Sequence, residues 1–196
     1  MNHTPFSEEE LRGAAQQYKS HTRGLPARTL DEDSFWDEER RMVEEFPETF
    51  QQAGAIPEPE YLKCLTKWKW AGLWANHAHK NTKQEIRRVT SDAFELTADD
   101  PTPEGEAVRR QLRRLSDLTG ISSATGSVLL TFWRPTVYTV MDQRALATLA
   151  SADLWTGNSE ANIDDYPRYL ELCRSIAANT ELTLRDTDRA LWFLGE

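Results

Sequence analysis

Residues 118–127 carry the most informative pattern in the chain: Leu118-Thr119-Gly120-Ile121-Ser122-Ser123-Ala124-Thr125-Gly126-Ser127. The pattern predicts two helices joined by a tight turn. Gly120 can adopt the backbone conformation that such a turn needs, and Ile121 would fill the apolar gap between the two helices. Ser122 or Ser123 would then cap the start of the second helix.

The second helix of this pair would begin with small residues, Ala124, Gly126 and Ser127, which allow close packing. The backbone N–H groups in the first turn of a helix have no partner within the helix, so they can bind a phosphate. The segment therefore predicts a helical hairpin whose turn faces a phosphate-bearing partner. An ordinary turn between two helices is the alternative interpretation.

An acidic residue follows the hairpin at a short distance. Arg134-Pro135 would end the second helix, and the extended run Tyr138-Thr139-Val140 leads to Asp142. Asp142 lies 22 residues after Gly120 and directly before the start of a further helix. Two interpretations of its carboxylate stay open, because aspartate is a favoured N-cap residue and also a common catalytic group.

Helix signals dominate the rest of the chain, and strand signals are nearly absent. One helix should open at a capping box formed by Ser7 and Glu10, and a third should run from Pro57 through Leu73. The others are expected near residues 34–50, 82–94, 103–118, 122–133, 142–150, 164–178 and 185–194. We therefore expect an all-α fold, a two-lobed helical bundle that contains the hairpin. Residues 1–196 would form a single domain, with residues 1–33 partly peripheral and residues 115–149 as its functional core.

Charge is unevenly distributed along the chain. The net charge is −9, which is unfavourable for a nucleic-acid partner, because affinity for DNA rests on Lys and Arg at phosphates. Residues 63–115, however, carry 11 basic and 7 acidic groups, whereas residues 1–62 carry 6 basic and 14 acidic groups. The middle of the chain would therefore meet DNA, since the local field matters more than the net charge.

The sequence argues against a membrane protein, a secreted protein and a metalloprotein. The sequence has no run of about 18 apolar residues, and Met1-Asn2-His3-Thr4-Pro5 lacks the basic and apolar regions of a signal peptide. Cys64 and Cys173 form no CxxC pair, and His77 and His79 have no nearby third ligand. We therefore expect a cytoplasmic monomer with no metal, no cofactor and no membrane partner.

The hairpin and the acid that follows it resemble the helix-hairpin-helix DNA glycosylase superfamily over about 35 residues. In that superfamily a similar hairpin is followed, at this spacing, by a loop that ends in Val-Asp at a helix start. Here Val140-Met141-Asp142 stands in the matching place. The resemblance implies that a nucleotide is flipped out of DNA and that Asp142 is the catalytic carboxylate. An ionised acid near C1′ would stabilise the oxocarbenium-like transition state and activate water.

The resemblance also implies contact with the DNA backbone along the hairpin, at Gly120, Ile121, Ser122, Ser123 and Ala124. Arg144 would bind a phosphate or pair with an acid. The chain departs from the family pattern where Ser122 replaces the second hairpin glycine. It departs again at Ala124, which takes the position of the Schiff-base lysine of bifunctional members, and no lysine follows Lys83. The resemblance therefore implies a monofunctional glycosylase.

Basic and aromatic residues interleave between Lys63 and Trp70, as on a surface that binds nucleic acid. Trp68 and Trp70 would point in different directions from a helix, so at least one should belong to the core. We expect a base pocket lined by Trp68, Lys69 and Tyr138. One further helix would carry a basic face, either solvated or in contact with phosphate, made of Arg109, Arg110, Arg113 and Arg114.

These features lead to one principal hypothesis, a monofunctional DNA N-glycosylase that excises a damaged or modified base. The substrate could be a repair lesion or a hypermodified base of phage DNA, so both DNA repair and antiviral defence stay open. The alternative is a non-catalytic helix-hairpin-helix protein that binds DNA or structured RNA.

Overall fold

The computed structural model describes residues 5–70, 77 and 79–195, and within these ranges it contains helices and no strand. The predicted all-α fold class is therefore confirmed. In chain order the helices are α1 (Glu8–Arg23), α2 (Phe35–Ala53), α3 (Pro59–Lys69), α4 (Lys83–Glu95), α5 (Gly105–Leu115), α6 (Ser123–Trp133), α7 (Gln143–Ser151), α8 (Tyr166–Thr180) and α9 (Leu184–Leu194).

Polar side chains cap the starts of six of these helices, whereas within the described residues α3, α5 and α8 have no side-chain cap. The side chains of Ser7, Ser34 and Thr82 each accept a hydrogen bond from the backbone N–H three residues later, at the starts of α1, α2 and α4. Such caps satisfy N–H groups that have no partner within the helix. The sequence predicts helix starts at all three residues, and these predictions are confirmed.

The C-terminal end of α3 differs from the prediction. The helix ends at Lys69, and Trp70 adopts an extended backbone; Leu73, where the predicted helix would end, lies outside the described residues. The Arg28 guanidinium donates hydrogen bonds to the carbonyl oxygens of Lys67 and Trp68. These contacts satisfy carbonyl groups that the last turn of a helix leaves without partners.

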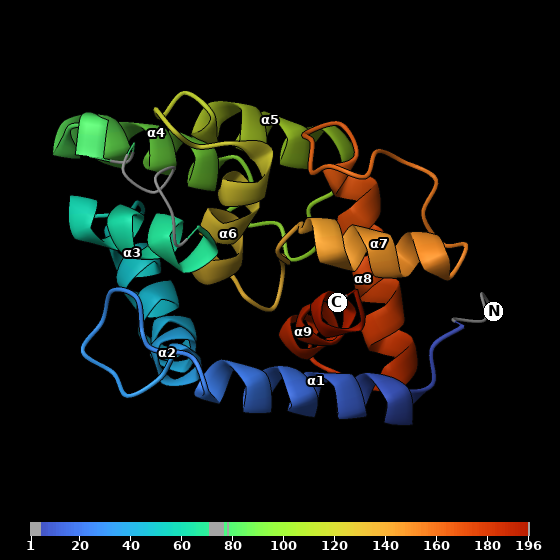
Figure 1. Ribbon diagram of the computed structural model, residues 1–196. Helices are drawn as coiled ribbons and strands as arrows, with labels where there is room; N and C mark the ends of the chain where they lie inside the picture. Colours follow the sequence, from blue (N-terminus) through green and yellow to red (C-terminus); the bar gives the residue numbers. More distant parts are fainter. Residues whose placement is uncertain (1–4, 71–76, 78, 196) are drawn as a thin grey trace.

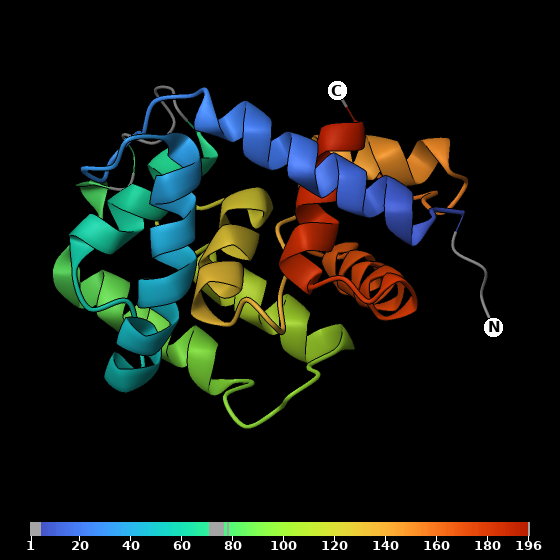
Figure 2. The same ribbon diagram turned by 90° about the horizontal axis from the view of Figure 1, so that it is seen from below.

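The helices form two neighbouring groups (Figure 1). In one group α6 lies in the middle and packs against α2, α3 and α5, while α4 packs against α5 and α3. In the other group α9 packs against α1, α7 and α8. Figure 2 shows α1 crossing α9, so the first and last helices of the chain lie together. Contacts between α1 and α2 and between α5 and α8 join the two groups.

The central position of α6 follows from its sequence. A helix that is apolar on all sides is stable only when it is surrounded by other elements, and α6 is buried at every residue from Thr125 to Trp133. Gly126 allows α5 to approach closely, because a Cβ atom there would lie 3.0 Å from a methyl group of Leu112. The predicted role of small residues at the start of this helix is confirmed at this contact.

The connection between α5 and α6 is longer than predicted, because α5 ends at Leu115 and not at Leu118, but its individual residues behave as expected. Gly120 has a φ of +84°, a conformation that favours glycine, and a Cβ there would lie 2.6 Å from that of His77. Ile121 is buried, and the Ser122 hydroxyl accepts a hydrogen bond from the Thr125 N–H at 3.4 Å. The turn therefore presents the N-terminus of α6 at the surface.

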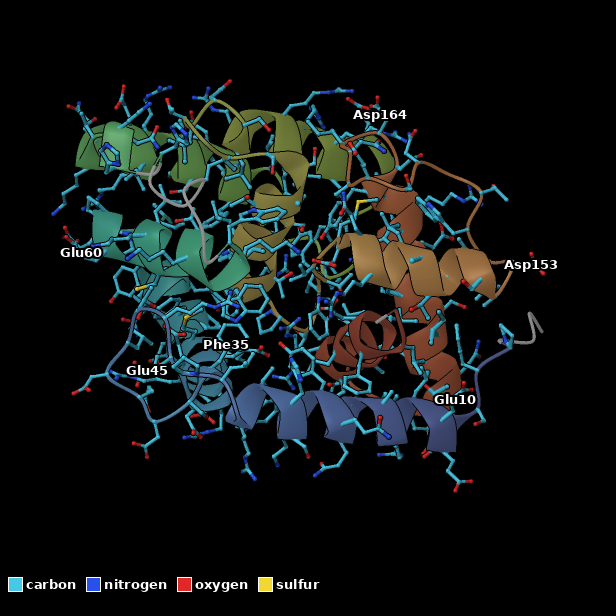
Figure 3. The ribbon with its side chains drawn as sticks, viewed as in Figure 1. Glu10, Phe35, Glu45, Glu60, Asp153 and Asp164 are labelled. Atoms are coloured by element: carbon cyan, nitrogen blue, oxygen red, sulfur yellow. The ribbon has the colours of Figure 1, made fainter. Side chains whose placement is uncertain are left out.

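Acidic side chains lie around the outside of the molecule, as the exposed Glu45, Glu60 and Asp153 do in Figure 3. The arginines of α5 are largely neutralised by such acids. Arg113 pairs with Glu106 and Asp164, and Arg114 pairs with Asp92 and Asp117. This pattern favours the solvated interpretation of the basic face. Among the described residues, no helix has both the length and the apolar character needed to cross a membrane.

Candidate active site

Asp142 stands at the end of a loop that is fixed on several sides. The Met141 N–H donates to the Ser127 hydroxyl at 2.9 Å, which attaches the loop to α6. The Tyr169 hydroxyl donates to the Val140 carbonyl oxygen at 2.9 Å, which attaches it to α8. Asp142 itself has an extended backbone and caps α7, accepting the Arg144 N–H on Oδ1 at 3.0 Å. The predicted cap is thus present.

The second oxygen of Asp142 is not used by the cap. Oδ2 accepts a hydrogen bond from the Lys69 ammonium, which reaches it from the end of α3. The Lys69 side chain is 6% exposed and that of Asp142 is 20% exposed. Burial acts to raise the pKa of Asp142, but the charge and hydrogen bond of Lys69, together with the Arg144 N–H, lower it below the ordinary value. The carboxylate is therefore ionised at neutral pH.

Two cavities meet at this ion pair. An inner pocket of about 110 Å³ has aromatic side chains in its wall, from Tyr18, Phe35, Trp68 and Trp192. An outer groove of about 380 Å³ runs past the N-termini of α6 and α7 and is lined in part by Ser122, Ala124 and Arg144. Three residues line both cavities: Lys69, Asp142 and Trp192. The carboxylate of Asp142 thus stands between an aromatic pocket and an open groove.

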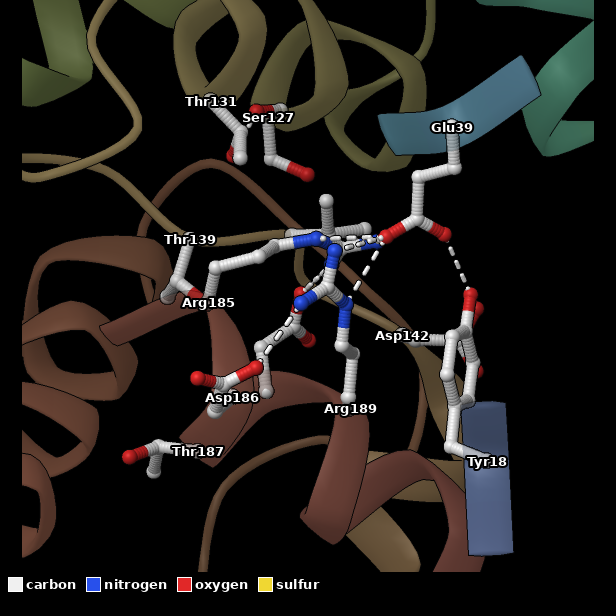
Figure 4. Close-up of polar contacts among 12 residues, drawn as sticks. Tyr18, Glu39, Ser127, Thr131, Thr139, Asp142, Arg185, Asp186, Thr187 and Arg189 are labelled. Atoms are coloured by element: carbon white, nitrogen blue, oxygen red, sulfur yellow. Dashed lines mark hydrogen bonds and ion pairs between the residues drawn. The ribbon is translucent and has the colours of Figure 1, made fainter. Parts of the chain in front are cut away.

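A buried cluster of charges forms part of the inner pocket (Figure 4). Glu39 of α2 is fully buried, and its Oε1 accepts hydrogen bonds from both Arg185 and Arg189 of α9. Its Oε2 accepts the Tyr18 hydroxyl of α1 at 2.6 Å. Burial acts to raise the pKa of Glu39, but the two arginines and the tyrosine lower it to about 2.

Asp188, which also lines the inner pocket, behaves differently from Glu39. Its Oδ2 pairs with Arg185, and within the described part of the chain its other oxygen has no hydrogen-bond partner. Burial raises its pKa to about 6, against the opposing effect of Arg185 and Lys69. The pocket therefore contains one carboxyl group that can be neutral or charged near neutral pH.

The residues predicted to contact DNA separate into two sets. Ser122, Ala124 and Arg144 line the groove that contains Asp142. Arg144 also stacks on Trp192, with its guanidinium carbon 4.3 Å from the ring centroid. Gly120, Ile121 and Ser122 line a neighbouring groove along the hairpin turn, and Ser123 is the half-buried first residue of α6. Ser122 is shared by both grooves.

Two of the three residues predicted for a base pocket lie together. Trp68 and Lys69 both line the inner pocket. Tyr138 does not, and its prediction is corrected. It is fully buried in the core, where its hydroxyl hydrogen-bonds to Thr97 at 2.7 Å and donates to Gln111 at 2.8 Å. These partners on the α4–α5 side hold the ring away from Asp142.

Sequence reasoning missed the contribution of α9 to the pocket, which consists of Arg185, Asp188, Arg189 and Trp192. These four residues have the spacing i, i+3, i+4 and i+7, which places them on one face of a helix. Apolar residues normally occupy such a face when a helix packs on a core. The charged residues at those positions in the sequence could therefore have indicated that α9 brings charge into the interior.

No metal centre was found among the residues that the structure describes, because no three His, Cys, Asp or Glu side chains there are arranged to hold an ion. Comparison of the chain with protein-family models, with curated proteins and with solved structures finds no match. The interpretation of the site therefore rests on its own chemistry.

Proposed function

We propose that the protein is a monofunctional DNA N-glycosylase that hydrolyses the bond between a damaged or modified base and its sugar. The observation that carries this proposal is the position of Asp142, between an aromatic pocket and a groove at the N-termini of α6 and α7. A flipped nucleotide needs this order of surroundings, with a pocket for the base, a carboxylate for the sugar and N–H groups for the phosphate.

Each part of the nucleotide has a partner of suitable chemistry. The base would stack against aromatic rings of the inner pocket, such as Trp68 and Trp192. The sugar would stand at Asp142, whose ionised carboxylate stabilises positive charge developing at C1′ and accepts a proton from the attacking water. The flanking phosphates would lie in the groove, near the N-termini of α6 and α7.

Two features of the groove bear on the finer assignment. Ala124 lines it where the resemblance expects a Schiff-base lysine, which supports hydrolysis without a lyase step through that position. Lys69 and Arg144 line the groove together with Asp142 and Glu160, so the charges of these four side chains balance. Binding of a phosphate there would depend on the backbone N–H groups at the N-termini of α6 and α7.

The test is an abasic-site assay with the purified protein. Duplexes that each contain uracil, hypoxanthine, 8-oxoguanine, N7-methylguanine or glucosylated 5-hydroxymethylcytosine are incubated with the protein and then cleaved with hot alkali. We expect alkali-dependent breaks in at least one duplex. Asp142→Asn should lower the single-turnover rate by about 10²- to 10⁴-fold, while asparagine still caps α7.

Asp92→Asn is the matched control, because it removes an exposed carboxylate of α4 that pairs with Arg114 of α5. Its rate should equal that of the wild type. DNA binding without breaks in any duplex, unchanged by Asp142→Asn, would instead identify a non-catalytic binding protein. Breaks confined to the glucosylated duplex would favour antiviral defence over repair.

A further inference from the structure

Lys69 occupies a position that the hydrolysis described above does not yet use. Its ammonium group directly contacts the carboxylate of Asp142, and only 6% of its side chain is exposed. It lines the inner pocket, where the base would lie, as well as the outer groove. The base and the catalytic carboxylate would therefore both be within reach of one amine.

The charges that face Lys69 come from several elements. Asp142 approaches from the start of α7, and Asp188 with its partner Arg185 approaches from α9. Glu39 of α2 is bound by both arginines of α9, and Arg144 acts on Asp142 from α7. Lys69 thus stands between two carboxyl groups, one ionised and hydrogen-bonded to it and the other buried with a raised pKa.

Lys69 differs from the other cations of the pocket in one chemical respect. Among the described residues that line it, the remaining cations are Arg28, Arg185 and Arg189. Arginine does not lose its proton in proteins, whereas a lysine ammonium can donate one. A nucleobase that leaves as an anion is a poor leaving group, so proton transfer to it lowers the barrier.

From this arrangement we infer that Lys69 is the general acid that protonates the departing base, an assignment that rests on the proposed glycosylase function. The N-glycosidic bond breaks, its electron pair passes to the base nitrogen, and Lys69 gives the base a proton. Water attacks C1′ and gives a proton to Asp142. Asp142 then passes that proton to the Lys69 amine across their direct contact. One water molecule is consumed, and the ion pair is restored.

The experiment uses whichever duplex of the panel the wild type cleaves. Lys69→Arg keeps a positive charge beside Asp142 but cannot donate a proton. We expect both Lys69→Arg and Lys69→Ala to lower the single-turnover rate by about 10²- to 10⁴-fold. Ethylammonium added to Lys69→Ala should raise its rate at least about 10-fold, whereas guanidinium at the same concentration should not. Thermal melting of each variant checks that it is folded.

The outcomes separate this inference from the proposed function. If the wild type cleaves no duplex, the glycosylase function fails, and the role of Lys69 fails with it. If the wild type is active and Lys69→Arg retains its rate, or guanidinium rescues Lys69→Ala as well as ethylammonium does, positive charge alone suffices and only the acid role is overturned. A borohydride-trapped covalent complex through Lys69 would also overturn it, since the amine would then attack the sugar. If Lys69→Arg keeps the wild-type rate and Asp188→Asn instead shows the loss expected for Lys69→Arg, Asp188 and not Lys69 is the general acid.

Discussion

Two groups of opposite charges border the same pocket, and they differ in how fully their partners enclose them. Glu39 has no exposed surface, and its two oxygens are taken by Tyr18, Arg185 and Arg189. Asp142 keeps 20% of its side chain exposed and borders an open groove. We call the first the enclosed cluster and the pair of Asp142 with Lys69 the open pair.

The difference indicates what each group does. The enclosed cluster joins α1, α2 and α9, and Glu39 could react only if contacts among three helices were broken. The open pair is held by a loop that other residues fix, so its charges can meet a ligand without loss of the fold. Ionisable groups of the same type therefore serve as structure in one place and as candidate chemistry in the other.

The largest expected effect is on the enclosed cluster. Glu39→Gln leaves two buried guanidinium groups without the carboxylate they share, so the free energy of unfolding should fall by about 3 to 5 kcal/mol. The melting temperature should fall by roughly 10 °C. Urea unfolding at pH 7 measures this loss. If Asp142→Asn destabilised the protein by as much, the two groups would not differ as described.

The next effect depends on pH and concerns Asp188, whose pKa is raised, whereas that of Glu39 is lowered. The pKa of Asp188 is about 6 in the folded protein, above the value of about 3.9 in an unfolded chain. Its contribution to stability is therefore intact below pH 4 and declines as the pH rises through 6. Relative to the wild type, Asp188→Asn should gain about 2 to 3 kcal/mol between pH 4 and pH 7. A constant difference in urea unfolding across this range would contradict the raised pKa.

A smaller effect is expected at the open pair. Asp142→Asn keeps the cap on α7, and Lys69 borders the open groove and still faces Asp188. The free energy of unfolding should therefore change by about 1 kcal/mol, while the excision proposed above should be lost. The same urea experiment measures the stability, and the abasic-site assay measures the rate. Loss of both to a similar degree would make Asp142 a structural residue.

The smallest effect is expected on the surface, where a third kind of ion pair provides the baseline. Arg113 of α5 is 52% exposed and pairs with Glu106 and Asp164. Solvent and salt screen such pairs, so Arg113→Gln should change stability by about 0.5 kcal/mol or less. A change in the rate of excision in this variant would show that the basic face of α5 meets DNA after all.

Local patterns allowed much of this molecule to be predicted. Caps at Ser7, Ser34 and Thr82, the positive φ of Gly120 and the cap at Asp142 all depend on neighbours a few residues away. The same holds for the all-α fold. Short-range chemistry of this kind can be recognised from sequence, because it requires particular residue types at fixed separations.

What could not be predicted depends on which helices meet. Tyr18 lines the pocket because α1 packs against α9, and Glu39 of α2 reaches the arginines of α9 through its side chain. No local pattern specifies these contacts. The misplaced Tyr138 has the same cause, since its direction is set by Thr97 in the turn after α4 and by Gln111 of α5. The prediction that Lys69 lines a base pocket could not specify its partner, because Asp142 lies 73 residues away.

The meeting of the first and last helices has a consequence for biosynthesis. Glu39 and Arg185 are separated by 146 residues, and contacts between distant parts of a chain form late and slowly in folding. A chain emerging from the ribosome would present the hairpin and Asp142 before α9 exists to close the pocket beside them. We therefore expect the pocket beside Asp142 to close only after synthesis has passed Trp192, which is part of its wall.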